Sequence, residues 1–290
     1  MENIFEKGCL VQLSSGVWGA SRKIKSDKLN GIANSPEWLT ASKKLVDPES
    51  LKPVKKVVNS ARTYLVSISL PFPIHGMAFV PKDLIETVDT ELNAYKERFN
   101  EEVERFMLDY DQLRSIAMNY LGDLFSEADY PVDLRKKFSF AWRFVILDVP
   151  NGNVGLLSPE VYAREKEKFI QTMEEARQLA VDSLREEFGS MVERLTERFT
   201  NGPDGKPKVF KNATVESFYD FFETFKQRNI FNDTGLAELV ERAQAILGGN
   251  SAENIRSNTS VKERIGAQMA SVEISMAELF EMPRRKIVLN

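Results

Sequence analysis

Hydrophobic residues recur at steps of three or four along two long stretches of the chain. In the first, which begins at Pro81, the apolar positions are Val88, Leu92, Tyr95, Phe99, Val103, Phe106, Tyr110, Leu113, Ala117, Tyr120 and Leu124. In the second, which follows Ser158 and Pro159, they are Phe169, Met173, Ala176, Ala180, Leu184, Phe188, Met191, Leu195 and Phe199. Such spacing is typical of helices that bury one face. We predict two helices of about forty residues each, paired as the arms of a long antiparallel, coiled-coil-like hairpin.

An aromatic segment at 122–157 separates the two arms. Within it, residues 138–147 are rich in aromatic and β-branched side chains, and the first seven alternate, which favours a strand. A strand cannot be stable alone, so it must pair with another segment or another chain. Three internal partners are open at this point: Leu10–Leu13, Val154–Leu157 and Lys286–Leu289.

Shorter patterns complete the expected fold. Residues 9–18 are typical of a strand. Asp47-Pro48 is a strong helix start, because the Asp side chain can cap free backbone amides and the N–H that proline lacks would have no partner at the first helical position. Beyond a Gly- and Pro-rich turn at 201–207, we expect helices at 213–228, 236–247 and 261–280. The second of these is expected to stop at Gly248-Gly249. The predicted class is mainly α and elongated, with a small β element and additional packing helices. Three segments are expected: 1–80 (strand and helix), 81–200 (the hairpin with its insert) and 201–290 (helical).

Composition narrows the function classes. The chain has 290 residues, 42% hydrophobic and 28% charged, with a net charge of −4, which favours a globular or coiled-coil protein. Its single cysteine, Cys9, excludes an internal disulfide framework and a multi-cysteine zinc site, and its single histidine, His75, excludes sites that need two imidazoles. The sequence contains neither a membrane-span-length apolar run nor a secretory leader pattern. We therefore expect a cytoplasmic protein.

No catalytic, cofactor-binding or metal-binding residues are predicted. The glycines at 202 and 205 lack the spacing of a phosphate-binding loop, and Pro207 removes a donor there. A Cys9–His75 dyad has no identifiable third group to orient it. Carboxylates on the two arms lack the Glu-x-x-His partner of a di-iron bundle.

Two sets of aromatic residues are candidate partner interfaces. Phe218, Phe221, Phe222 and Phe225 form a helical stripe, and Phe140, Trp142 and Phe144 lie on one side of the predicted strand. The alternative for the stripe is packing onto the protein's own core.

A candidate basic patch lies in the N-terminal segment. Residues 1–64 carry eleven basic and six acidic side chains, so this segment is positive although the chain is negative. The patch consists of Arg22, Lys23, Lys25, Lys28, Lys55 and Lys56. The alternative is an ordinary solvated surface.

Several N-terminal motifs occur in a recognisable order. They are Leu10-Val-Gln-Leu, Val17-Trp-Gly, the basic segment to Leu29, Lys43-Lys-Leu-Val-Asp-Pro-Glu-Ser-Leu-Lys-Pro53 and Phe79-Val-Pro81. Over most of residues 8–200 the chain resembles the bacterial and phage proteins grouped as the domain of unknown function DUF3150. That resemblance implies no activity and no catalytic residues. It implies companionship with MoxR/cobaltochelatase-type AAA+ ATPases and von Willebrand factor A-domain proteins.

The leading functional expectation is a non-enzymatic adaptor or scaffold. It would assemble with itself or with an AAA+ ATPase or von Willebrand factor A-type machine, with bacterial or phage conflict as one setting. The alternative is a nucleic-acid-binding accessory protein that uses the basic N-terminal segment. A membrane-active helical protein is disfavoured by the charged helix faces.

Overall fold

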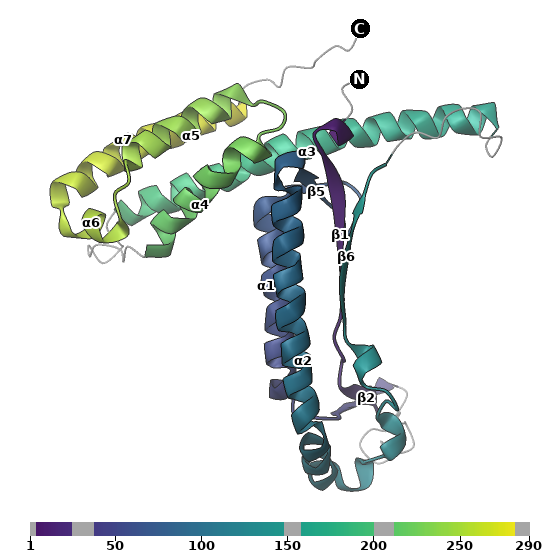
Figure 1. Cartoon of the computed structure of the whole chain (residues 1–290). Helices are drawn as coiled ribbons and strands as arrows, with labels where there is room; N and C mark the ends of the chain where they lie inside the picture. The colour runs from purple at the N-terminus through teal and green to yellow at the C-terminus, as the bar shows by residue number, and fades with distance from the viewer. Residues whose placement is uncertain (1–3, 25–37, 148–157, 200–211, 282–290) are drawn as a thin grey trace. The chain divides into compact units, whose positions relative to one another are not determined.

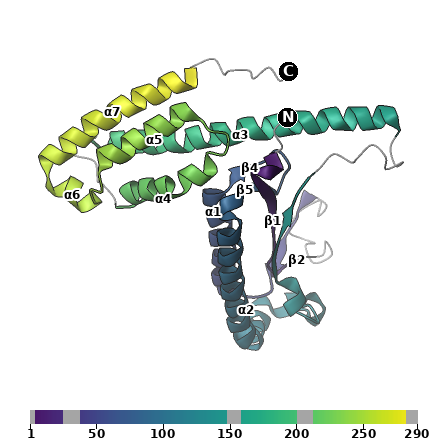
Figure 2. The ribbon, with the colours of Figure 1, turned by 45° about the horizontal axis from the view of Figure 1, so that its top comes forward.

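The computed structural model describes residues 4–24, 38–147, 158–199 and 212–281. The chain divides into two compact units (Figures 1 and 2). Unit 1 consists of Met1–Leu10, Ile68–Ile85 and Ile146–Asn290, and unit 2 consists of Val11–Ser67 and Glu86–Val145. The described residues are mainly helical, with two small sheets, which confirms the predicted class at that level.

Two helices that lie side by side, α1 (Lys52–Ile68) and α2 (Ile85–Leu121), form the main part of unit 2 (Figure 1). A short 3-10 turn, Pro48–Leu51, leads into α1. The Asp47 side chain caps that turn by accepting a hydrogen bond of 2.9 Å from the Glu49 amide, as the Asp-Pro signal predicts.

The core of unit 2 consists of two apolar clusters along these helices. In the first, Val58 and Ala61 of α1 pack with Phe99 and Val103 of α2 and with Phe140 of strand β6 (Ser139–Val145). In the second, Trp18, Leu45, Phe106 and Tyr130 come together, and the Tyr130 hydroxyl donates to the Leu45 carbonyl at 2.8 Å. The apolar stripe of α2 is therefore covered by α1, by Phe140 of β6 and by the cluster around Trp18.

Strands β2 (Ser21–Lys23) and β3 (Ser42–Lys44) form an antiparallel pair in unit 2. The register places Arg22 opposite Lys43, two like charges that would repel. Asp129 relieves this repulsion, because its carboxylate lies 2.5 Å from the Lys43 ammonium and its carbonyl accepts from Arg22 at 3.5 Å.

Unit 1 is built on the long helix α3 (Pro159–Phe199). Helix α4 (Asn212–Arg228) and helix α7 (Thr259–Glu281) pack against α3, and helices α5 (Thr234–Leu247) and α6 (Ala252–Ser257) pack against α7. Helix α5 ends at Gly248, whose φ of 50° is the left-handed conformation that the Gly-Gly stop signal predicts. The short α6 was not expected from the sequence.

The first third of α3 is less buried than the rest of the helix. Figures 1 and 2 show it running on beyond the helices that cover the rest of α3. From Pro159 to Thr172 no side chain is buried, and Met173 is the first that is. The described residues of unit 1 therefore cover this segment less completely than the rest of α3.

Two partly buried ion pairs tie α3 to the helices around it. The Arg185 guanidinium donates to the Asp233 carboxylate at 2.6 Å and to the Leu279 carbonyl at 3.3 Å, while Asp233 also caps α5. Arg228, at the end of α4, is 2% exposed and makes a two-pronged contact with Glu187 of α3, at 3.2 and 2.6 Å. These contacts fix how the helices of unit 1 are placed around α3.

The larger sheet has the strand order β4-β5-β1-β6. Strand β1 (Gly8–Gly16) begins in unit 1, beside β5 (Ala78–Pro81) and its antiparallel neighbour β4 (Leu70–Pro71), and ends in unit 2. A Cβ at Gly8 would lie 2.2 Å from the Val80 carbonyl oxygen, so the approach of these strands requires glycine. Strand β1, which contains the candidate partner Leu10–Leu13, is the neighbour of the aromatic strand β6.

The expected pairing of the two long helices is not confirmed. Both helices are present, but α2 lies in unit 2 and α3 in unit 1. The apolar stripe of α2 is covered by α1, and that of α3 by α4 and α7. The two units also differ from the three consecutive segments 1–80, 81–200 and 201–290, because each unit collects residues from separate parts of the chain.

Among the described helices, none combines the length and hydrophobicity needed to cross a membrane. The turn at 201–207, the candidate pairing segment Val154–Leu157 and the tail Lys286–Leu289 lie outside the described residues.

We predict that Arg228→Ala lowers the free energy of unfolding by about 2–3 kcal/mol. This is below the 3–5 kcal/mol typical of a broken buried pair, because the Glu187 side chain left behind is 34% exposed and can be hydrated. Urea denaturation followed by circular dichroism measures the change. Arg242→Ala is the control: Arg242 donates to Ser271 at the surface, so its removal should cost less than about 0.5 kcal/mol. Equal losses in the two variants would contradict the prediction.

Candidate functional site

The solvent face of α1 carries only basic charges. Burial of Val54, Val58, Ala61 and Leu65 fixes which side of the helix faces inward. The charged residues of α1 are Lys52, Lys55, Lys56 and Arg62, all exposed. Because α1 contains no Asp or Glu, this face has no acidic residue of its own to balance them.

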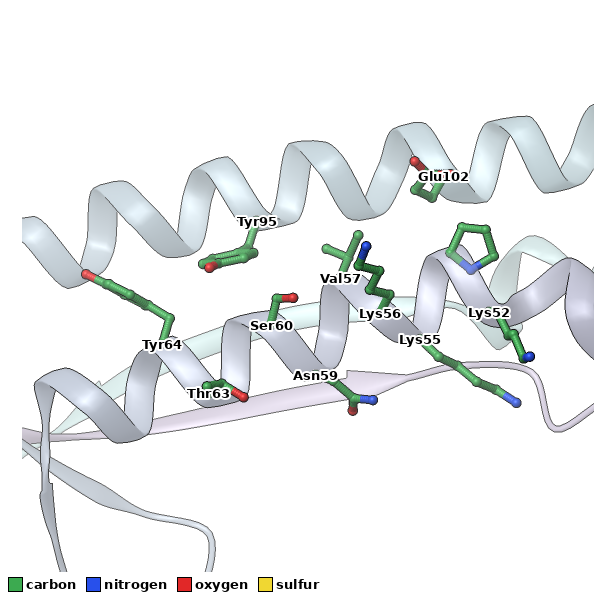
Figure 3. Close-up of a pocket in the computed structure, with 11 residues that line it drawn as sticks. Lys52, Lys55, Lys56, Val57, Asn59, Ser60, Thr63, Tyr64, Tyr95 and Glu102 are labelled. Carbon is green, nitrogen blue, oxygen red and sulfur yellow. The ribbon is translucent and has the colours of Figure 1, made fainter. Parts of the chain in front are cut away.

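A groove of about 1130 Å³ runs between α1 and α2 (Figure 3). Figure 3 shows Lys56, Ser60 and Tyr64 on the side of α1 toward α2, with Tyr95 and Glu102 on α2 across from them. The tyrosines lie at one end of the groove and Lys52 and Glu102 at the other. All of these residues belong to unit 2.

A second hollow of about 210 Å³ lies on the other side of α1, against the end of β1. Lys55, Asn59 and Arg62 line it together with Ser15 and Val17. The Arg62 guanidinium donates to the Ser15 hydroxyl at 2.9 Å. Since Lys55 and Asn59 border both hollows, α1 forms a basic ridge between two concave surfaces.

The charges of this ridge are only partly paired. The Lys52 ammonium lies 2.6 Å from Glu49, and Glu102 pairs with Arg105 at 2.8 Å. Within the part of the chain that the structure describes, Lys55 and Lys56 form no ion pair. Two adjacent lysines are thus available to an anion from outside.

Tyr64 and Tyr95 form an aromatic pair in the groove, with ring centroids 5.9 Å apart. The Arg98 guanidinium lies over the Tyr95 ring, 4.3 Å from its centroid. The Tyr64 hydroxyl is buried and has no hydrogen-bond partner among the described residues. Burial raises the pKa of Tyr64 to about 12, with smaller contributions from Glu91 and Tyr95.

The phenylalanine stripe proposed as a partner interface lies in the core of unit 1. Phe218, Phe221 and Phe225 are 0, 3 and 7% exposed, and only Phe222 is half-buried. Phe221 stacks on Phe188 of α3, with centroids 5.6 Å apart. The alternative of core packing is therefore what the structure shows, because the stripe covers the apolar face of α3.

The aromatic strand is also turned mainly inward. Phe140 is 5% exposed and contacts Phe99, with ring centroids 5.5 Å apart. Trp142 is half-buried, and its indole N–H donates to the Asp89 carboxylate at 2.8 Å. Only Phe144, 36% exposed, is substantially open to solvent. Of the three aromatic residues in this candidate interface, only Phe144 is therefore exposed enough to contact a partner.

The described residues of the candidate basic patch lie on two separate elements, β2 and α1. Arg22 and Lys23 are exposed on β2, whereas Lys55 and Lys56 are exposed on α1. Lys25 and Lys28 lie outside the described residues. Sequence reasoning did not place Lys52, Arg62, Tyr64 and Tyr95 in a site, although the absence of acidic residues between 50 and 67 is visible in the sequence.

The residues considered for catalysis are not brought together as a site. Cys9 is 6% exposed, and burial raises the pKa of its thiol, which makes the thiolate nucleophile scarcer. His75 is exposed on the chain between β4 and β5. Among the described residues, no three His, Cys, Asp or Glu side chains cluster so as to hold a metal ion.

Fold and surface together define a mainly helical protein with a small antiparallel sheet and a basic helix face. A family model described as "Protein of unknown function (DUF3150)" matches residues 5–198. The chain belongs to this family, as the resemblance in the N-terminal motifs predicts. No curated protein and no solved structure matches it.

We predict that the groove tyrosine makes stability fall at high pH. The Tyr64 hydroxyl ionises near pH 12 in the folded protein but near pH 10 when unfolded, so the folded state retains the proton longer. The free energy of unfolding should then fall as the pH rises from 10 to 12, and by less in Tyr64→Phe. Urea denaturation at pH 8, 10, 11 and 12 measures the difference. Identical pH profiles for the two proteins would contradict the assignment.

Proposed function

We propose that this protein is a non-enzymatic adaptor that binds a protein partner through the distal half of α2. The supporting observation is a set of large apolar side chains exposed there. Leu108 is 85% exposed, Tyr120 88% and Ile116 39%. These positions, with Gln112, are spaced four residues apart, so they follow one ridge of the helix.

The ridge is distinct from the face that α2 buries. Phe99, Val103 and Phe106 are buried, and so is Ala117 farther along. Leu108, Ile116 and Tyr120 therefore form a second apolar surface on the same helix. Apolar residues scattered singly on a surface need no explanation, but three on one helix ridge, interrupted only by Gln112, favour association.

The partner is proposed from the family resemblance together with this surface. An AAA+ ATPase or a von Willebrand factor A-domain protein is the partner that the resemblance implies, and a second copy of the chain is the alternative. A helix ridge of this kind inserts into a groove on its partner through residues one turn apart. The uncovered first third of α3 also favours assembly, because it offers an additional helix surface.

We predict that Leu108→Asp combined with Tyr120→Ser abolishes partner capture and leaves the fold intact. Both side chains are largely exposed, so the free energy of unfolding should change by no more than about 0.5 kcal/mol for each substitution. A charge at Leu108 and the loss of the Tyr120 ring should together weaken binding by about a hundredfold. Co-purification from native cells identifies the partner, and light scattering of the pure protein tests self-association.

The matched control is Ile274→Asp, on α7 in unit 1. Ile274 is also an exposed apolar helix residue, at 64%. Its substitution should leave capture unchanged. The proposal fails if the wild-type protein is monomeric and captures nothing, or if Ile274→Asp reduces capture as much as the α2 variant does.

A further inference from the structure

We propose that the solvent face of α1 binds the phosphodiester backbone of single-stranded nucleic acid. The site consists of the basic ridge and the groove between α1 and α2. It does not use the apolar ridge of α2, so it is an additional binding function that stands apart from the adaptor role.

The first argument is the uniform charge of the face. From Lys52 to Arg62 the four cations extend over ten helical steps, about 15 Å at 1.5 Å per residue. At 3.4 Å per nucleotide of a stacked strand, this length faces about four phosphates. Lys55 and Lys56, which form no ion pair with other described residues, are placed to neutralise two of them.

The second argument is the neutral hydrogen-bonding side chains between the cations. Asn59 and Thr63 lie along the ridge, and Ser60 lies on the side toward α2 (Figure 3). Amide and hydroxyl groups are common donors to phosphate and sugar oxygens. The α1 face alternates cations with neutral donors and has no carboxylate of its own, which suits a chain of phosphates. The carboxylate that lines the groove from α2, Glu102, is paired with Arg105 at 2.8 Å.

The third argument is the aromatic end of the groove. Tyr64 and Tyr95 line the same groove as Lys56, and the Tyr64 hydroxyl still lacks a partner among the described residues. Aromatic rings next to cations are the combination with which proteins hold single strands, because each base offers a stacking face. An acidic peptide would use the lysines but not the rings.

The shape favours a single strand over a duplex. The groove lies on the surface along the line where α1 and α2 meet (Figure 3), with Lys56 and Tyr64 on one helix and Tyr95 on the other. Such a space admits one extended chain with its bases against the tyrosines. A duplex keeps its bases stacked inside and would touch only the outer lysines.

The test measures binding of the full-length protein to fluorescent 20-nucleotide single strands of DNA and RNA by anisotropy, from 50 to 300 mM NaCl. Binding should weaken steeply with salt. Lys55→Ala/Lys56→Ala should weaken it about tenfold at 50 mM and reduce the log–log salt slope by about 1.4, since each single-strand phosphate contact contributes about 0.7.

The matched control is Lys136→Ala/Lys137→Ala, which removes two adjacent exposed lysines from the same unit. It should change the affinity by less than about twofold, because these residues lie outside the groove. Circular dichroism confirms that both variants fold. An equal loss of affinity in the two double variants overturns the site, since it would show that binding depends only on the net charge of the protein.

Three further outcomes also overturn the proposal. They are absence of binding to either single strand at 50 mM NaCl, tighter binding to a 20-base-pair duplex than to its separate strands, and displacement of the strand by poly-glutamate at equal charge. None of these bears on partner capture, which the α2 ridge variant tests.

Discussion

Two helices of 37 and 41 residues each carry an apolar stripe that water must not reach, and the need to cover these stripes governs the rest of the structure. Unit 2 covers α2 with α1, the Trp18 cluster and Phe140 of β6. Unit 1 covers α3 with α4 and α7, and Arg185 and Arg228 fix the placement of its helices through partly buried ion pairs. On the distal ridge of α2, large apolar side chains stay exposed, and in the first third of α3 no side chain is buried.

Local signals in the sequence are enough to predict most of the elements. Asp47-Pro48 predicts a capped start, Gly248 predicts a left-handed stop, and the aromatic run at 138–147 predicts a strand. Each depends on side chains within a few residues, so sequence reasoning captures it. Pairing depends on residues far apart, and a stripe shows that a face is buried without showing what buries it. For that reason the two long helices were expected to pair with each other, although each has nearer cover in its own unit.

The candidate site was predictable to a similar extent. Lys55 and Lys56 follow from the charge pattern, but their association with Tyr64 and Tyr95 requires the packing of α1 on α2. Spacing alone also fails to separate a core stripe from an interface. Phe218 and Tyr120 both occupy helical apolar positions, yet one is 0% exposed and the other 88%. Phe218 has α3 to pack against, whereas Tyr120 lies near the end of α2, past the last buried residue of that helix, Ala117.

The two proposed surfaces of unit 2 differ in the physics of binding, and this difference separates them experimentally. The basic ridge acts through charges in water, and at 0.15 M salt the Debye length is about 8 Å, so phosphate contacts weaken as salt rises. The ridge of Leu108, Ile116 and Tyr120 acts through burial of apolar surface, which salt does not screen. A complex held by α1 should therefore dissociate in high salt, while one held by α2 should persist. If one partner engages both helices, only the electrostatic part of its affinity will vary with salt, and the residual affinity at high salt will measure the apolar part.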